Sequence, residues 1–165
     1  LTDVFRIVRW LMGDVSAIGI EPVLQLLPFI LVGLVTIMAL TRELNLLSVG
    51  EELAQSRGVA AGRVRAVLLV VTSLVVGAIV AMCGPIAFVG LMVPHTCRRL
   101  VGPDHRILGI ASIFAGGLFL VLCDTVARTV VAPAQIPVGV ITGLLGGPYF
   151  IALLLHHRTG DMGGE

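Results

Sequence analysis

Few side chains of this 165-residue chain could do chemistry, and most of those lie near the ends of apolar segments. Cys83, Cys97 and Cys123 are isolated in apolar runs without CxxC spacing, which predicts small packing residues rather than disulfides or metal ligands. No HExxH or GxSxG motif occurs, and no Ser/His pair suggests a nucleophile with its base. The sequence therefore predicts no catalytic residue, no metal site and no cofactor.

A charged segment near position 50 could instead bind a partner. Residues 48–51 fit a capping box, in which Ser48 accepts from the Glu51 amide and Glu51 reaches back. Gly58 fits the left-handed position that follows a helix. Together they predict a short helix over 49–57, with Glu51 and Glu52 in its first turn. Such a helix is only about 14 Å long and marginal alone in water, so it is either a surface turn or a docking element.

Two further positions carry polar groups beside apolar segments. Arg128 follows Asp124 by four residues, the acid-first spacing that stabilises a helix by about 0.2–0.5 kcal/mol. His95 follows Pro94, and its imidazole could be a ligand or proton relay. We favour the simpler interpretation, in which His95 caps carbonyls freed by the proline. His156 and His157 read as interfacial residues rather than a metal site.

The composition identifies the surroundings of these groups. Hydrophobic residues make up 57% of the chain and charged residues 13%, against about 25% charged in soluble domains. Lipid or neighbouring apolar helices are therefore the solvent for most of the chain. The net charge of +1 argues against nucleic-acid binding.

Uncharged apolar runs predict the membrane spans. A helix needs about 20 apolar residues, and at least about 17, to cross the hydrocarbon core. Four of five runs are long enough, while the third falls short and needs help from its flanks, a thinner bilayer or neighbouring protein. The runs are 23–40, 66–83, 84–97, 107–123 and 138–155. We expect an all-α polytopic membrane helix bundle of about five transmembrane helices, with a short helix outside the lipid.

The arginines predict the orientation. With five alternating spans, 41–65, 98–106 and 156–165 share one side, and the other side keeps only Arg6, Arg9 and Arg128. The positive-inside rule makes the arginine-rich side cytoplasmic. We therefore expect a periplasmic loop over 1–22, a cytoplasmic loop over 41–65 and a cytoplasmic tail over 156–165.

Several motifs resemble one family of membrane proteins. They are NLLSVGEELA at 45–54, RGV at 57–59, the stretch 84–106, CDTVAR at 123–128, QIPVG at 135–139, TG at 142–143 and GPYF at 147–150. In this order they are similar to the permease subunits of the FecCD family, the ABC importers for ferric siderophores, haem and vitamin B12. The resemblance is to the carboxyl-terminal half, helices six to ten of ten, which implies that Leu1 is an internal residue.

The resemblance implies partners and a place in the cell. Two permease subunits form the translocation path in a bacterial inner membrane, two cytoplasmic ATPase subunits hydrolyse the ATP, and a substrate-binding protein docks outside. The permease itself is then no enzyme. Arg128 matches an arginine that receives a glutamate of the binding protein. The residues that match the ATPase-coupling loop are Asn45, Gly50, Glu51, Glu52, Ala54 and Gly58.

Three other interpretations stay open from the residues themselves. An ion-coupled secondary transporter would fit the broken spans, but it usually keeps acids inside the membrane, and no Asp or Glu lies within the five runs. An intramembrane enzyme lacks its motifs. A non-functional remnant of a split permease gene would share the same ancestry.

Overall fold

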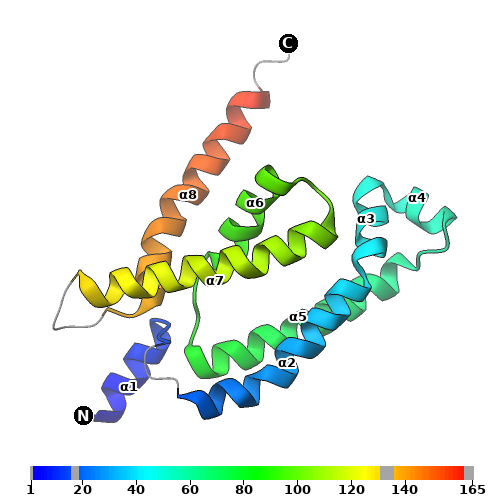
Figure 1. Cartoon of the computed structure of the whole chain (residues 1–165). Helices are drawn as coiled ribbons and strands as arrows, with labels where there is room; N and C mark the ends of the chain where they lie inside the picture. Colours follow the sequence, from blue (N-terminus) through cyan, green and yellow to red (C-terminus); the bar gives the residue numbers. More distant parts are fainter. Residues whose placement is uncertain (1, 16–18, 131–135, 162–165) are drawn as a thin grey trace.

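The computed structural model describes residues 2–15, 19–130 and 136–161, and within them it contains helices and connecting turns alone (Figure 1). In chain order the helices are α1 (Thr2–Leu11), α2 (Ile20–Ala39), α3 (Thr41–Val49), α4 (Glu51–Ser56), α5 (Ala61–Cys83), α6 (Val89–Val101), α7 (His105–Thr129) and α8 (Val138–Asp161). The all-α prediction is confirmed. The predicted tail starts inside α8, and residues 162–165, like Leu1, 16–18 and 131–135, lie outside the described residues.

Four of these helices are long and apolar enough to cross a membrane: α2, α5, α7 and the 138–155 part of α8. Only 6–17% of their apolar windows is buried within the chain. Soluble monomers rarely expose apolar patches of more than a few hundred Å². The exposed apolar faces are therefore surfaces for lipid or for further membrane helices, and the chain is a multi-pass membrane protein.

The third predicted span, 84–97, is a helix only from Val89 onward. Its helix, α6, has 13 residues and is about 20 Å long, short of the roughly 30 Å hydrocarbon core. Residues 84–88 precede it without regular structure and can add up to about 16 Å. The stretch 84–101 thereby joins opposite ends of the bundle, since Cys83 contacts the α1 turn and Asp104 contacts α3.

A tight turn after α1 is packed against the ends of two other helices. The Trp10 indole Nε1–H donates to the carbonyl of Ala81 in α5 at 3.1 Å. The backbone N–H of Asp14 donates to the Cys83 carbonyl at 2.8 Å, and that of Gly139 in α8 donates to the Gly13 carbonyl at 2.9 Å. Segments about 70 and 125 residues apart are thus joined through their backbones.

Three glycines, Gly13, Gly84 and Gly139, allow this close approach, and we call them the glycine clasp. Gly13 and Gly84 have φ of 74° and 73°, a region that favours glycine. A Cβ on Gly84 would meet the Trp10 carbonyl oxygen, and one on Gly139 would meet the Met12 carbonyl oxygen. The clasp therefore fixes the α5–α6 junction and the start of α8 around the α1 turn.

Gly146 of α8 leaves room for the side chain of Phe88, which belongs to the α5–α6 junction. Phe88, the residue before α6, has φ of +65°, which is uncommon for a residue with a side chain. A Cβ on Gly146 of α8 would overlap the Phe88 side chain. Phe88 thus packs directly on the backbone of α8, which positions the start of α6.

Candidate interaction sites at the two ends of the bundle

The predicted coupling segment is a pair of short helices, α3 and α4, separated by one glycine. Gly50 adopts φ 157° and ψ 142°, which breaks the helix and turns the chain. Ala54 is fully buried, whereas Glu51, Glu52 and Leu53 are exposed. Helix α4 packs on α3 and on α5, so it presents its acidic face outward from a supported position.

The predicted helix over 49–57 and its capping box are wrong in detail. Ser48 lies inside α3, and its hydroxyl donates to the Asn45 carbonyl of the same helix at 2.7 Å. Such a bond to an i−3 carbonyl is an alternative to capping for a serine, and Gly50 precedes α4 without a side-chain cap. The left-handed end at Gly58 is confirmed, with φ of 83° and its N–H donating to the Gln55 carbonyl at 2.9 Å.

Glu51 is held by an arginine of its own chain. Arg65 Nη2 lies 2.6 Å from Glu51 Oε2, and Nη1 lies 3.4 Å from Oε1. Both side chains are about half exposed, so the pair contributes at most about 1 kcal/mol. Glu51 can therefore exchange this partner for another cation at small cost, and Glu52 lies exposed beside it.

A cavity of about 770 Å³ lies between α3, the α4–α5 turn and the α6–α7 turn. Its charged lining combines arginines with two acids, Glu43 and Asp104. Glu43 Oε2 is buried without a hydrogen-bond partner among the described residues. The arginines of the lining are Arg42, Arg57 and Arg106.

Asn45 connects α3 to the start of α7. Its amide Nδ2 donates to Asp104 Oδ1 at 2.9 Å, and its Oδ1 accepts from the backbone N–H of His105 at 2.9 Å. Asp104 caps α7 by accepting from the Arg106 N–H at 3.0 Å. That N–H, and after it the Asn45 amide, lower the pKa of Asp104 below its ordinary value. At neutral pH Asp104 is therefore an ionised acceptor.

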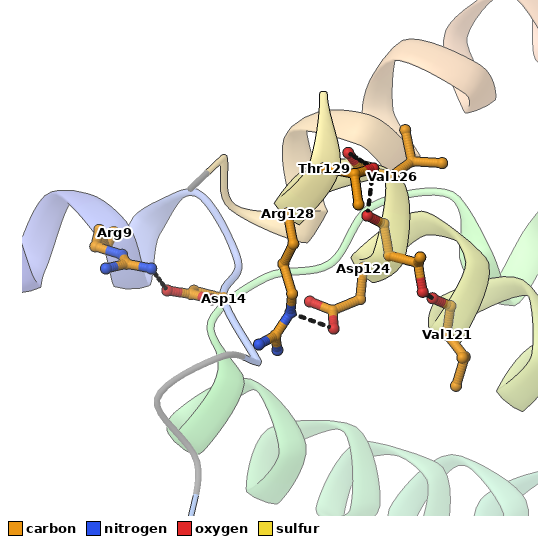
Figure 2. A network of polar contacts seen from close by, with 8 residues as sticks. Arg9, Asp14, Val121, Asp124, Val126, Arg128 and Thr129 are labelled. Atoms are coloured by element: carbon orange, nitrogen blue, oxygen red, sulfur yellow. Dashed lines mark hydrogen bonds and ion pairs between the residues drawn. The ribbon is translucent and has the colours of Figure 1, made fainter. Parts of the chain in front are cut away.

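At the opposite end, two arginines are each paired with an aspartate (Figure 2). Arg128 Nε donates to Asp124 Oδ2 at 2.7 Å, the pair predicted from the i,i+4 spacing. Arg9 Nη2 lies 2.7 Å from Asp14 Oδ2, on the turn that follows α1. Each arginine side chain is 45% exposed. This end therefore offers guanidinium groups that are oriented by acids yet accessible.

His95 of α6 is half-buried and packs against α8. Its ring meets Tyr149 of α8 edge to face, with centroids 6.3 Å apart, while the Tyr149 hydroxyl lies 3.1 Å from Thr96 Oγ1. His95 Nε2 is buried without a hydrogen-bond partner among the described residues, so the expected carbonyl capping is not formed by that atom. The described residues contain no cluster of metal-binding side chains, and their cysteines are buried and free.

Sequence reasoning missed the groups that act across long separations. The Asn45–Asp104 and Trp10–Ala81 contacts span 59 and 71 residues. Local sequence patterns do not predict such distant pairs. The role of Asp104 as an N-cap could have been predicted, because it follows Gly-Pro and precedes an apolar run. Long apolar helices, a short helix that completes a crossing together with its irregular flank, and a structured short-helix pair define a polytopic membrane bundle of the kind that transporters use.

Comparison with known proteins identifies the family to which this membrane bundle belongs. The FecCD transport family matches residues 1–156, and the chain belongs to this family. It is 42% identical over 158 residues to the uncharacterized ABC transporter permease protein YvrB of Bacillus subtilis, covering 96% of this chain and 45% of that protein. It is 41% identical over 149 residues to the hemin transport system permease protein HmuU of Yersinia pestis, and this match covers 90% of this chain and 45% of that protein.

A solved structure has the same fold. It is a proposed metal-chelate type ABC transporter in an inward-facing conformation, with a TM-score of 0.83 and 34% identity. The match covers 91% of this chain and 50% of that one. The chain thus spans about half the length of the relatives it matches, and it corresponds to part of a permease.

Proposed function

We propose that the chain is the carboxyl-terminal half of a permease subunit of a binding-protein-dependent ABC importer in the bacterial inner membrane. Family membership over residues 1–156 supports this function. The cargo class is an iron–siderophore or a related chelate, because the names of similar proteins include hydroxamate, hemin and cobalamin import systems. ATP hydrolysis belongs to separate ATPase subunits, and a second permease subunit completes the path.

The α3–α4 pair is then the contact for the ATPase on the cytoplasmic side. The arginine distribution supports this orientation, because the side of α3 and α4 carries eight of the eleven arginines. The same count supports a cytoplasmic carboxyl end. Ala54 anchors α4 while Glu51 and Glu52 face outward. This arrangement suits a short element that transmits force between two proteins.

The proposal is tested by breaking α4 in the assembled transporter. Ala54→Pro removes the hydrogen bond from the Ala54 N–H to the Gly50 carbonyl, which is 3.0 Å long. We expect cargo uptake in proteoliposomes to be lost while ATP hydrolysis, if the ATPase still binds, no longer depends on cargo. Gln55→Ala, at an exposed position of the same helix, is the matched control and should transport normally. Normal transport by Ala54→Pro contradicts the coupling role.

On the outer side, Arg128 is proposed to dock a carboxylate of the substrate-binding protein. Asp124 holds the guanidinium in place, and a surface pair of this kind is weak enough to be exchanged. Arg128→Glu in nanodiscs should weaken binding-protein affinity about tenfold or more. Asp124→Asn keeps the arginine and should leave the affinity for the binding protein unchanged or higher. Equal affinity of Arg128→Glu and the unaltered permease would refute the docking proposal.

A further inference from the structure

Hydrogen bonds at Asn45 tie α3 to a helix that is remote in the sequence. Asn45 Oδ1 accepts from the His105 N–H at 2.9 Å and lies 2.6 Å from His105 Nδ1, while Asn45 Nδ2 donates to Asp104 Oδ1 at 2.9 Å. The side chain thus uses both ends of its amide on two consecutive residues of another segment. We call Asn45, Asp104 and His105 the α3–α7 joint.

The donors and acceptors of the joint define one arrangement. The ionised Asp104 carboxylate only accepts and the His105 backbone N–H only donates, so the amide nitrogen of Asn45 faces Asp104 and its oxygen faces His105. Because that oxygen accepts, His105 Nδ1 carries the proton in the 2.6 Å contact. An amide is the side chain that meets both demands, since a carboxylate lacks the donor.

The joint lies at the start of a long helix. Asp104 caps α7 and His105 is its first residue, and α7 runs 25 residues, about 37 Å, to the Asp124–Arg128 end. On the other side, α3 is joined to α4 through Gly50 alone. Of the helices outside the pair, α3 packs most closely on α7, and the joint adds directional hydrogen bonds to that packing.

We propose that Asn45 is a positioning residue that passes displacement of the α3–α4 pair to α7. This inference rests on the proposed function, because it takes the ATPase as the source of that displacement. A rigid helix held at its first turn moves as a unit, so movement at α3 shifts the far end of α7, where Arg128 lies. The joint thus connects the ATP-driven end of the permease to its cargo-receiving end.

The experiment exchanges the two side chains of the joint. Asn45→Asp sets two carboxylates against each other, whereas Asn45→Asp combined with Asp104→Asn restores one amide donor and one carboxylate acceptor. Asparagine also caps a helix well, so the exchange keeps the start of α7. Thr72→Ala is the matched control, since the Thr72 hydroxyl donates to carbonyls of its own helix, α5, away from the α3–α4 pair and the joint.

The readout is cargo transported per ATP hydrolysed, in proteoliposomes of the permease with its ATPase and binding protein. We expect Asn45→Asp to lower this ratio about tenfold, the effect of losing one hydrogen bond to a charged group. The double exchange should recover most of the ratio, and Thr72→Ala should leave it unchanged. Co-purification of the ATPase should be equal in all variants, which separates coupling from assembly.

The outcomes separate the joint from the proposed function. A normal ratio in Asn45→Asp, or a double exchange as poor as the single one, overturns the joint. Where Asn45→Asp does not assemble, Asn45→Ala replaces it, because alanine removes the bonds to Asp104 and His105 without introducing repulsion, and a normal ratio there has the same consequence. Failure of the proposed function appears differently, as normal transport by Ala54→Pro.

Discussion

Replacing Gly84 by alanine should open the glycine clasp at the end of α5. The residue sits at φ 73° and ψ 179°, a region that essentially only glycine occupies, and alanine there costs about 1–3 kcal/mol. The new Cβ would also overlap the carbonyl oxygen of Trp10, which is backbone and cannot rotate away. Overpacking of this kind costs a further 1–3 kcal/mol or so. We therefore expect Gly84→Ala to destabilise the fold by about 2–6 kcal/mol.

The chain offers both a local probe and a matched control. Trp10 is its single tryptophan, and its indole bonds the Ala81 carbonyl three residues before Gly84. Fluorescence of Trp10 in detergent should therefore shift to the red at temperatures where α-helical circular dichroism is still native. Gly77→Ala lies in the same helix with open space around its Cβ position, and it should be neutral or gain up to about 1 kcal/mol.

The midpoint of thermal unfolding measures the total effect. One kcal/mol corresponds to about 2–4 °C in a chain of this size, so Gly84→Ala should melt at least about 4 °C lower than the unaltered chain. The reasoning would be refuted by a Gly84→Ala protein that melts like Gly77→Ala and keeps the native Trp10 emission. That result would mean that the α1 turn does not contact the α5–α6 junction closely.

Three further changes test other contacts. Gly33→Ala should lower the thermal midpoint by several degrees, because a Cβ would lie 2.6 Å from Cγ2 of the stiff Val75 side chain. Asp104 has a lowered pKa in the fold, so it stabilises the fold at a pH above its unfolded value of about 3.9. That stability should fade as the pH falls through the lower folded-state pKa, and Asp104→Asn should flatten this part of a stability-against-pH curve. Arg65→Ala should change unfolding by less than about 1 kcal/mol, because its pair with Glu51 is exposed, and a larger loss in calorimetry would assign that pair a structural role.

The sequence predicted those parts of the molecule that depend on nearby residues. The four long spans follow from runs of apolar residues, the Arg128–Asp124 pair from a spacing of four, and the end of α4 from Gly58. The capping box failed because two local options competed: Ser48 could cap a new helix or bond back within the preceding one. The glycine clasp and the α3–α7 joint could not be predicted, because each depends on which distant segments meet.

The two ends of the bundle differ in the kind of contact that holds them. At the α1 end, glycines allow backbone to touch backbone, and close packing of this kind resists displacement. At the α3 end, the joint consists of hydrogen bonds among polar side chains that are exposed or half-buried. Hydrogen bonds at exposed positions can exchange their partner for water, so these contacts can adjust as the helices move. Under the proposed function, we therefore expect displacement to enter through the joint and to move α7, while the clasp keeps the α1 turn, the α5–α6 junction and the start of α8 as the fixed reference.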